Sequence, residues 1–218
     1  MGTLKEDAYI KIREGIVTLK FKPGQWLHDT ELSKLFNIGR TPIREALIKL
    51  EQEGFVKSMT NKGFMVSEID AKGINELYEV RAYMESLAVR RLSLDPLPEK
   101  IKILEDIFIN IKNLNDNLPL SVRFNIGQKF HRTLIALSEN ELAISIMDTV
   151  YDHIERVRWL DISLNDRFVE NMESHLRIIK LIKEGDTEGA EKEVKRHVFA
   201  SKDSILKFFE QRKNLLYL

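Results

Sequence analysis

Three of the five histidines in the chain could bring imidazole nitrogens to one metal ion. They are His131, His175 and His197, and each lies in a separate segment with the hydrophobic periodicity of a helix. Neutral imidazole is the commonest protein ligand of transition metals, and three imidazoles are enough to hold Zn²⁺ or Ni²⁺. Because the residues are far apart in the sequence, two interpretations stay open: a shared metal site, or three unrelated core and surface histidines.

Two arginines in the same part of the chain could bind an anionic small molecule. Arg81 and Arg158 both have apolar neighbours in the sequence. A cation held against apolar groups tends to pair with a carboxylate. That carboxylate can belong to a ligand or, for Arg81, to Glu85 one helical turn later. Arg81 and Arg158 are therefore candidate effector-binding residues, with a structural ion pair as the alternative.

A third group of residues could contact nucleic acid. Arg40-Thr41-Pro42 opens a helix, where Pro is tolerated because the first N–H groups have no helical partner. The positions that helical periodicity assigns to the core are Ile43, Ala46, Leu47 and Leu50. Arg40, Thr41, Arg44 and Lys49 are left at the helix start or on its outer faces, where they could contact a DNA major groove. An ordinary solvated surface helix is the alternative.

The elements around this helix favour the DNA-binding interpretation. The sequence predicts a helix over about residues 4–20, a Pro-Gly turn, a short helix from residue 29 or 30 onward, and a tight turn at 37–39. Two short helices joined by such a turn form a helix-turn-helix. Beyond Gly54, segments 55–59 and 64–67 predict a hairpin, or wing. Its Lys62-Gly63 tip could approach the sugar-phosphate backbone closely.

Residues 70–218 predict only helices. Breaks at 96–98, 115–119, 138–140, 163–165 and 185–186 divide this segment into six amphipathic helices. The second of these is marked by Ile101, Leu104, Ile107, Phe108 and Ile111. Short connections between the helices favour an antiparallel bundle. The predicted fold is therefore mainly α, with an N-terminal winged helix-turn-helix domain at 1–69 and a C-terminal six-helix antiparallel bundle at 70–218.

Composition limits the classes of function. The 218 residues are 43% hydrophobic and 31% charged, as in ordinary globular proteins, and contain no Cys, which excludes disulfides, thiolate metal sites and Cys nucleophiles. The net charge is zero, but residues 1–67 carry 11 Lys and Arg against 8 Asp and Glu, which suits an N-terminal part that meets nucleic acid. No apolar run is long enough to cross a membrane, and we expect a cytoplasmic protein.

Ordered motifs run along both parts of the chain. In the N-terminal part they are Tyr9…Ile16, Lys22-Pro23-Gly24-Gln25-Trp26-Leu27, Glu31-Leu32-Ser33, Arg40-Thr41-Pro42-Ile43-Arg44-Glu45-Ala46-Leu47, Glu53-Gly54-Phe55-Val56 and Asn61-Lys62-Gly63-Phe64. In the C-terminal part they are Glu79-Val80-Arg81…Glu85, Phe130-His131, Glu139-Asn140-Glu141, His175, Glu184-Gly185-Asp186 and His197. The first set resembles the winged-helix domain of the GntR family of bacterial transcription regulators. The second is similar to the all-helical FCD effector domain of that family's FadR-type branch.

The resemblance implies a dimeric, ligand-responsive regulator, usually a repressor, that binds a double-stranded DNA operator. It implies that Arg40, Thr41, Arg44 and the Gly63 wing tip meet the operator. Lys49 and Lys62 are further candidates for contacts to the DNA backbone.

The same resemblance implies a metal bound by His131, His175 and His197, with a small carboxylic acid effector beside it. Zn or Ni is the expected metal, and Arg81 and Arg158 are the candidate partners of the effector. Two alternatives stay open: a metal-free regulator whose histidines contact the effector directly, and a metal-dependent enzyme. We do not expect an enzyme, because no general base flanks the histidines in the sequence.

Two positions depart from the family pattern. Gly39 stands where the family commonly has Ser before Arg-Thr-Pro, and a Gly cap costs only a few tenths of a kcal/mol against Ser. Gly127 stands four residues before His131, where metal-binding members usually carry Asp or Asn. With one anionic ligand fewer, we expect weaker metal binding.

Overall fold

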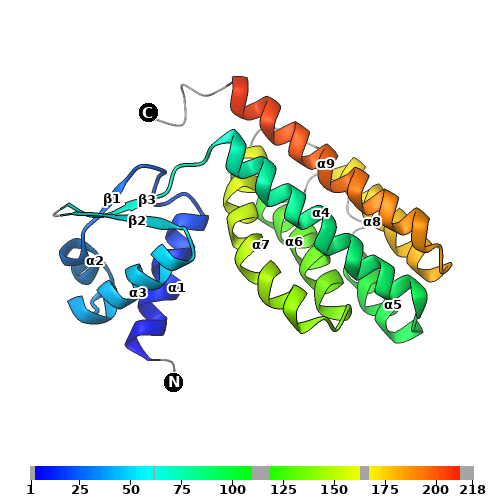
Figure 1. The fold of residues 1–218 in the computed structure, drawn as a ribbon, viewed down its shortest axis with the longest axis horizontal. Coiled ribbons are helices and arrows are strands. Elements are labelled where there is room, and N and C mark those ends of the chain that lie inside the picture. The colour runs from blue at the N-terminus through cyan, green and yellow to red at the C-terminus, as the bar shows by residue number, and fades with distance from the viewer. Residues whose placement is uncertain (1–2, 61, 110–117, 163–166, 212–218) are drawn as a thin grey trace. The chain divides into compact units, whose positions relative to one another are not determined.

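A computed structural model of the chain describes residues 3–60, 62–109, 118–162 and 167–211. They form two compact units, one with the residues up to Asp70 and one with Ala71–Glu210 (Figure 1). Helices dominate both units, so the predicted mainly α fold is confirmed. Among the described residues, no helix is both long and apolar enough to span a membrane.

The first unit is built around three helices. They are α1 (Leu4–Val17), α2 (Asp29–Phe36) and α3 (Arg40–Gln52). α3 packs against α1 and α2 through the predicted stripe, because Ile43, Ala46, Leu47 and Leu50 are all fully buried. α1 begins with a capping box between Thr3 and Glu6, and it ends three residues earlier than predicted, just before Leu19 takes a positive φ of 59°.

The turn between α2 and α3 is tight. Asn37 adopts the left-handed conformation with φ 52°, and the Ile38 N–H donates to the Ser33 carbonyl at 3.2 Å. The Ser33 hydroxyl donates to the Ile38 carbonyl at 2.7 Å. Gly39 is the N-cap of α3, and no side chain caps the helix. The predicted helix-turn-helix is therefore present, with α3 as its second helix.

A three-stranded antiparallel sheet completes the first unit. Its strands are β1 (Trp26–Leu27), β2 (Val56–Met59) and β3 (Gly63–Val66), in the order β1-β3-β2. The predicted hairpin is β2–β3, with Val56 opposite Val66 and Met59 opposite Gly63, while Asn61 lies outside the described residues. Gly63 has φ +95°, which explains a glycine there. β1 was not predicted from the sequence.

The second unit is a bundle of long helices. They are α4 (Ala71–Leu94), α5 (Pro98–Asp106), α6 (Leu120–Leu137), α7 (Glu141–Ile162), α8 (Phe168–Lys183) and α9 (Thr187–Gln211). α4 runs through the bundle in contact with α6, α7 and α8 (Figure 1). Six helices were predicted, and six are described here.

Two boundaries in the bundle differ from the prediction or are not described. The periodicity predicted an α5 that includes Phe108 and Ile111, but the helix ends at Asp106. Phe108 still belongs to the core, since its side chain is 1% exposed in the turn that follows. Ile111 lies outside the described residues, as does the predicted start of the next-to-last helix at 163–165.

Candidate functional site

The three predicted metal ligands converge in the core of the bundle. His131 comes from α6, His175 from α8 and His197 from α9, and their side chains are 3–4% exposed. The Nε2 atoms form a nearly equilateral triangle: His175 lies 3.2 Å from each of the other two, and His131 and His197 lie 3.3 Å apart. Among the described residues, these three histidines are a group of side chains whose ligand atoms lie close enough together to bind one metal ion.

These distances match the requirements of a metal ion. Two ligands at about 2.0–2.1 Å from a tetrahedral Zn²⁺ are separated by about 3.3–3.4 Å. The triangle of Nε2 atoms can therefore bind an ion with little rearrangement. The residues present fit a divalent transition metal, with a fourth position left for another ligand.

A second layer of buried groups fixes the orientation of one ligand. Nδ1 of His131 lies 2.9 Å from Oε2 of Glu85, whose side chain is fully buried. Glu85 also accepts hydrogen bonds from Nε of Arg81 at 2.7 Å and from the Tyr151 hydroxyl at 3.1 Å. A carboxylate at this distance favours the tautomer of His131 with its proton on Nδ1, which leaves the Nε2 lone pair facing the cluster.

Burial disfavours the charged form of all three imidazoles. Burial is the first cause that lowers the pKa of His131, His175 and His197 well below the usual value. The positive charge of Arg81 adds to this effect at all three histidines. Neutral imidazoles offer lone pairs, and three lone pairs that point at one another are stabilised by a bound cation.

His175 is oriented by packing. Its ring centroid lies 4.3 Å from that of Phe130 and 5.6 Å from that of Phe108. Its Nδ1 is buried and has no hydrogen-bond partner among the described residues. The aromatic neighbours therefore hold the ring in place, whereas a carboxylate does so for His131.

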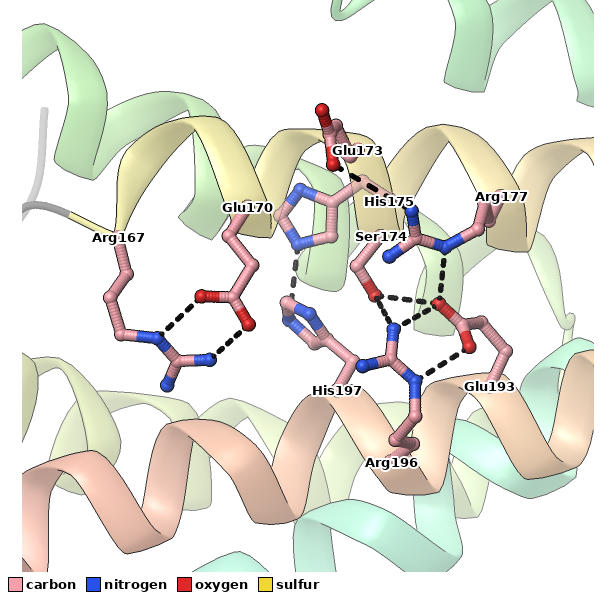
Figure 2. A network of polar contacts seen from close by, with 9 residues as sticks. All are labelled: Arg167, Glu170, Glu173, Ser174, His175, Arg177, Glu193, Arg196 and His197. Atoms are coloured by element: carbon pink, nitrogen blue, oxygen red, sulfur yellow. Dashed lines mark hydrogen bonds and ion pairs between the residues drawn. The ribbon is translucent and has the colours of Figure 1, made fainter.

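A network of polar side chains lies between α8 and α9 beside His175 and His197 (Figure 2). Glu193 accepts hydrogen bonds from Arg196 at 2.6 and 2.8 Å, from Ser174 at 2.9 Å and from Arg177 at 3.0 Å. Hydrogen bonding from Arg196 is the first cause that lowers the pKa of Glu193 to about 2. Ser174 and Arg196 also line a small pocket together with His197, so this network borders the histidine cluster.

The two candidate effector arginines have different surroundings. Arg81 is 2% exposed and its Nε pairs with Glu85, so the structural ion pair considered for it is present. Arg158 is half-buried on α7 and lies beside Gly127 on α6. A Cβ atom added at Gly127 would lie 2.9 Å from an Nη atom of Arg158. A guanidinium therefore lies where the resemblance noted in the sequence predicted an acidic or amide ligand.

Four of the six predicted DNA-binding residues share one groove of the first unit. Arg40, Arg44, Lys62 and Gly63 line it, and the other residues around it are Trp26, His28, Asp29, Ser58, Met59, Thr60 and Phe64. The groove lies between the start of α3 and the wing, and its charged side chains are basic except for Asp29. Asp29 was not predicted to take part, yet it accepts hydrogen bonds from Arg40 at 3.2 and 3.3 Å.

The other two predicted DNA-binding residues are not among those that line the groove. Thr41 is exposed at the start of α3, next to Arg40. Lys49 has its ammonium 3.8 Å from the centre of the Tyr9 ring and 3.8 Å from a carboxylate oxygen of Glu53. These contacts hold Lys49 beside Tyr9 of α1, and the contact to DNA predicted for it stays a prediction.

Comparison with known proteins gives the same two-part division. The family described as "Bacterial regulatory proteins, gntR family" matches residues 4–66, and the FCD domain family matches residues 76–200. The uncharacterized HTH-type transcriptional regulator YdhC of Bacillus subtilis (strain 168) is 30% identical over 190 residues, which cover 87% of this chain and 85% of YdhC.

Two solved structures have a related fold. McbR/YncC of E. coli superposes with a TM-score of 0.78 at 17% identity, covering 97% of this chain and 99% of that chain. The Zn²⁺-bound FCD domain of TM0439 is 28% identical with a TM-score of 0.54, and the match covers 65% of this chain and 96% of that domain. The likeness to the first concerns the fold alone, whereas the second is a metal-bound relative of the bundle.

Proposed function

The chain belongs to the GntR family of bacterial transcription regulators and carries that family's FCD domain, and from this premise we propose a metal-dependent repressor that senses a small carboxylic acid. The coarse function follows from the family: a transcriptional regulator with a DNA-binding helix-turn-helix and an FCD effector domain. We propose further that it acts as a homodimer in the cytoplasm.

The observation that carries the proposal is the triangle of Nε2 atoms at 3.2–3.3 Å in His131, His175 and His197. These residues would hold Zn²⁺ or Ni²⁺. The ion would supply a Lewis-acid position that takes one oxygen of a carboxylate. The Zn²⁺-bound FCD domain of TM0439 supports the choice of metal.

The geometry favours a metal over direct contact between the histidines and the effector. At neutral pH the lowered pKa values leave the three imidazoles uncharged. Uncharged imidazoles whose lone pairs converge do not attract a carboxylate by themselves. A divalent ion held by the three histidines would supply the positive charge that an anion needs in order to bind there.

On the DNA side, Arg40 and Arg44 would contact base edges or phosphates from the start of α3, with Thr41 beside them. Lys62 and Gly63 at the wing tip would contact the sugar-phosphate backbone. Two copies joined through their bundles would place their two winged-helix units on adjacent half-sites of a roughly two-fold operator. An effector changes operator affinity only if it binds one arrangement of these two units better than another.

The proposal can be tested with the purified full-length protein, without an affinity tag. Its operator is first selected from random double-stranded DNA. Gel-shift affinity is then measured with and without Zn²⁺, and with a panel of small carboxylic acids. We expect at least one acid to weaken operator binding in the presence of Zn²⁺, and His175→Ala to abolish this response while leaving DNA binding intact. An acid response that is unchanged in His175→Ala would contradict the metal-based sensor.

A further inference from the structure

His28 lies in the groove between the start of α3 and the wing. It immediately precedes α2, and its side chain is exposed among the residues that line the groove. A Cβ atom added at Gly63 would lie 3.4 Å from Nδ1 of His28 and 3.9 Å from its Cε1. The imidazole therefore lies beside the backbone of the wing, at a residue that has no side chain to cover it.

The fold makes no use of the ring nitrogens of this imidazole. His28 is the N-cap of α2, yet its side chain caps no N–H group of that helix. Among the described residues, none donates a hydrogen bond to its ring or accepts one from it. N-cap positions favour Ser, Thr, Asp and Asn, so helix capping does not explain a histidine here. Both ring nitrogens are available to a ligand that enters the groove.

The charges in the groove favour a polyanion as that ligand. The charged side chains that line the groove with His28 are Arg40 and Arg44 of α3, Lys62 of the wing and Asp29 of α2. Three cations thus share the groove with one carboxylate, and that carboxylate pairs with Arg40 at 3.2 Å. Because the cations come from both α3 and the wing, a DNA backbone that binds to both would pass beside His28.

An imidazole next to a phosphate responds to pH. Imidazole ordinarily changes its charge between about pH 5 and 8, and its charged form has an N–H donor on both nitrogens. A phosphate within hydrogen-bond distance favours that charged form. The DNA complex would then hold more protons than the free protein over this range. Linkage therefore requires the DNA affinity to rise as the pH falls.

We propose that His28 contacts the DNA backbone of the operator and that its protonation couples operator binding to pH. This inference rests on the proposed DNA-binding groove. Residues 1–70 contain no other histidine, so the imidazole of the groove can be tested by one substitution. Uptake of one proton limits the rise in affinity to about tenfold per pH unit. One added phosphate contact should also steepen the slope of log K against log salt by up to about 0.9.

Fluorescence anisotropy of the full-length protein with a labelled operator duplex tests the inference. Affinity is measured between about pH 8 and about pH 6 at several salt concentrations. A chelator is present throughout, because metal binding by histidines itself depends on pH. We expect a several-fold rise in affinity and a steeper salt dependence as the pH falls. Calorimetric titration in two buffers of different ionisation enthalpy should show proton uptake on DNA binding. Affinity and salt dependence that do not change with pH would overturn the inference.

Three variants identify the source of the pH response. His28→Gln keeps a polar side chain that cannot become charged, so the rise in affinity and the proton uptake should both disappear. His28→Lys carries its charge throughout this range, so its affinity should change little with pH. His153→Gln removes a histidine of the second unit and should respond to pH like the natural protein. A full response in His28→Gln would overturn the assignment of His28.

Two further variants separate the role of His28 from that of the groove. If Arg44→Ala binds the operator as tightly as the natural protein does, the proposed DNA-binding groove itself is wrong. If Arg44→Ala weakens binding but the natural protein shows no pH response, the groove stands and His28 is an ordinary solvated residue. Asp29→Asn keeps the imidazole, so its pH response should persist. A response lost in Asp29→Asn and retained in His28→Gln would assign it to the carboxylate.

Discussion

Nδ1 of His131 lies 2.9 Å from Oε2 of Glu85, and both side chains are buried. Through this contact a carboxylate on α4 orients a candidate metal ligand on α6. Glu85 is also the ion-pair partner of Arg81, so one carboxylate both contacts the histidine cluster and neutralises a buried guanidinium. Removing its charge should therefore affect metal binding and folding stability by separate routes.

Glu85→Gln should weaken Zn²⁺ binding by about 10- to 100-fold, because groups that orient and polarise a ligand contribute this much to metal affinity. It should also lower the free energy of unfolding by about 3–5 kcal/mol, since Arg81 loses its buried partner. Calorimetry and urea denaturation measure the two effects. The double variant Arg81→Met, Glu85→Gln should regain part of the stability and none of the metal affinity. If the double variant regained both stability and Zn²⁺ affinity, Glu85 would affect metal binding only through the stability of the fold.

Arg44→Ala should weaken operator binding by about 1–3 kcal/mol if Arg44 contacts a base edge, with the fold unchanged. Lys49→Ala is the matched control on the same helix. Because Lys49 lies against Tyr9 and Glu53, its loss should leave DNA affinity nearly unchanged and lower stability by about 0.5–1 kcal/mol. Gel shifts and thermal unfolding of both variants test this. Equal losses of DNA affinity in the two variants would show that the groove does not define the interface.

Asp29→Asn should strengthen DNA binding. Asp29 is the acidic side chain of the groove and pairs with Arg40 at 3.2 Å, so it competes with phosphate for that guanidinium. Removing its charge should raise affinity most at low salt, where exposed charges are least screened. Gel shifts over a series of salt concentrations would show this. If affinity falls instead, Asp29 positions Arg40 for its contact with DNA.

Sequence periodicity predicted the elements that bury a regular stripe. In α3 the four predicted core residues are all fully buried, and the bundle helices follow the predicted breaks closely apart from α5, which ends early at Asp106. β1 was missed because two residues are too few to show an alternating pattern. Lys49 lies nine residues after Arg40, about two and a half helical turns, so the two side chains leave α3 on different sides.

The histidines of the candidate metal site could be predicted from the sequence, but their arrangement in space could not. Residue types identified the three histidines, but their convergence depends on how α6, α8 and α9 are rotated against one another in the bundle. The contact between Gly127 and Arg158 depends in the same way on the register of α6 against α7. A missing acidic ligand was visible in the sequence, whereas the guanidinium that takes its place was visible only in three dimensions.

Gly39→Ser should stabilise the first unit slightly. Gly39 is the N-cap of α3 with φ −56° and ψ 154°, a conformation open to any residue, and a Cβ there would meet only Pro42 atoms at 3.7 and 3.8 Å. A Ser hydroxyl can cap the first N–H groups and should add a few tenths of a kcal/mol. Gly39→Ala lacks that hydroxyl and should lie about 1 kcal/mol below the Ser variant in urea denaturation. Equal stability of the two variants would exclude a capping role.

The Glu193 carboxylate should make the bundle sensitive to acid. Hydrogen bonds from Arg196, with contributions from Arg177 and Ser174, lower its pKa from 4.5 to about 2. A carboxylate with a lowered folded-state pKa stabilises the protein above its unfolded value, and this contribution is lost as the pH falls from about 4.5 toward 2. Glu193→Gln should therefore cost on the order of 1 kcal/mol at pH 7, since solvent screens part of the interaction.

The test of this contribution is the difference in unfolding free energy between the natural protein and Glu193→Gln. Urea denaturation across acidic pH should show that difference shrinking as Glu193 becomes protonated. Glu184→Gln is the matched control, because Glu184 makes an exposed ion pair with Lys180 at 3.8 Å, which should contribute little. A difference for Glu193→Gln that stays constant with pH would mean that its charge does not stabilise the fold, and that the variant acts through packing alone.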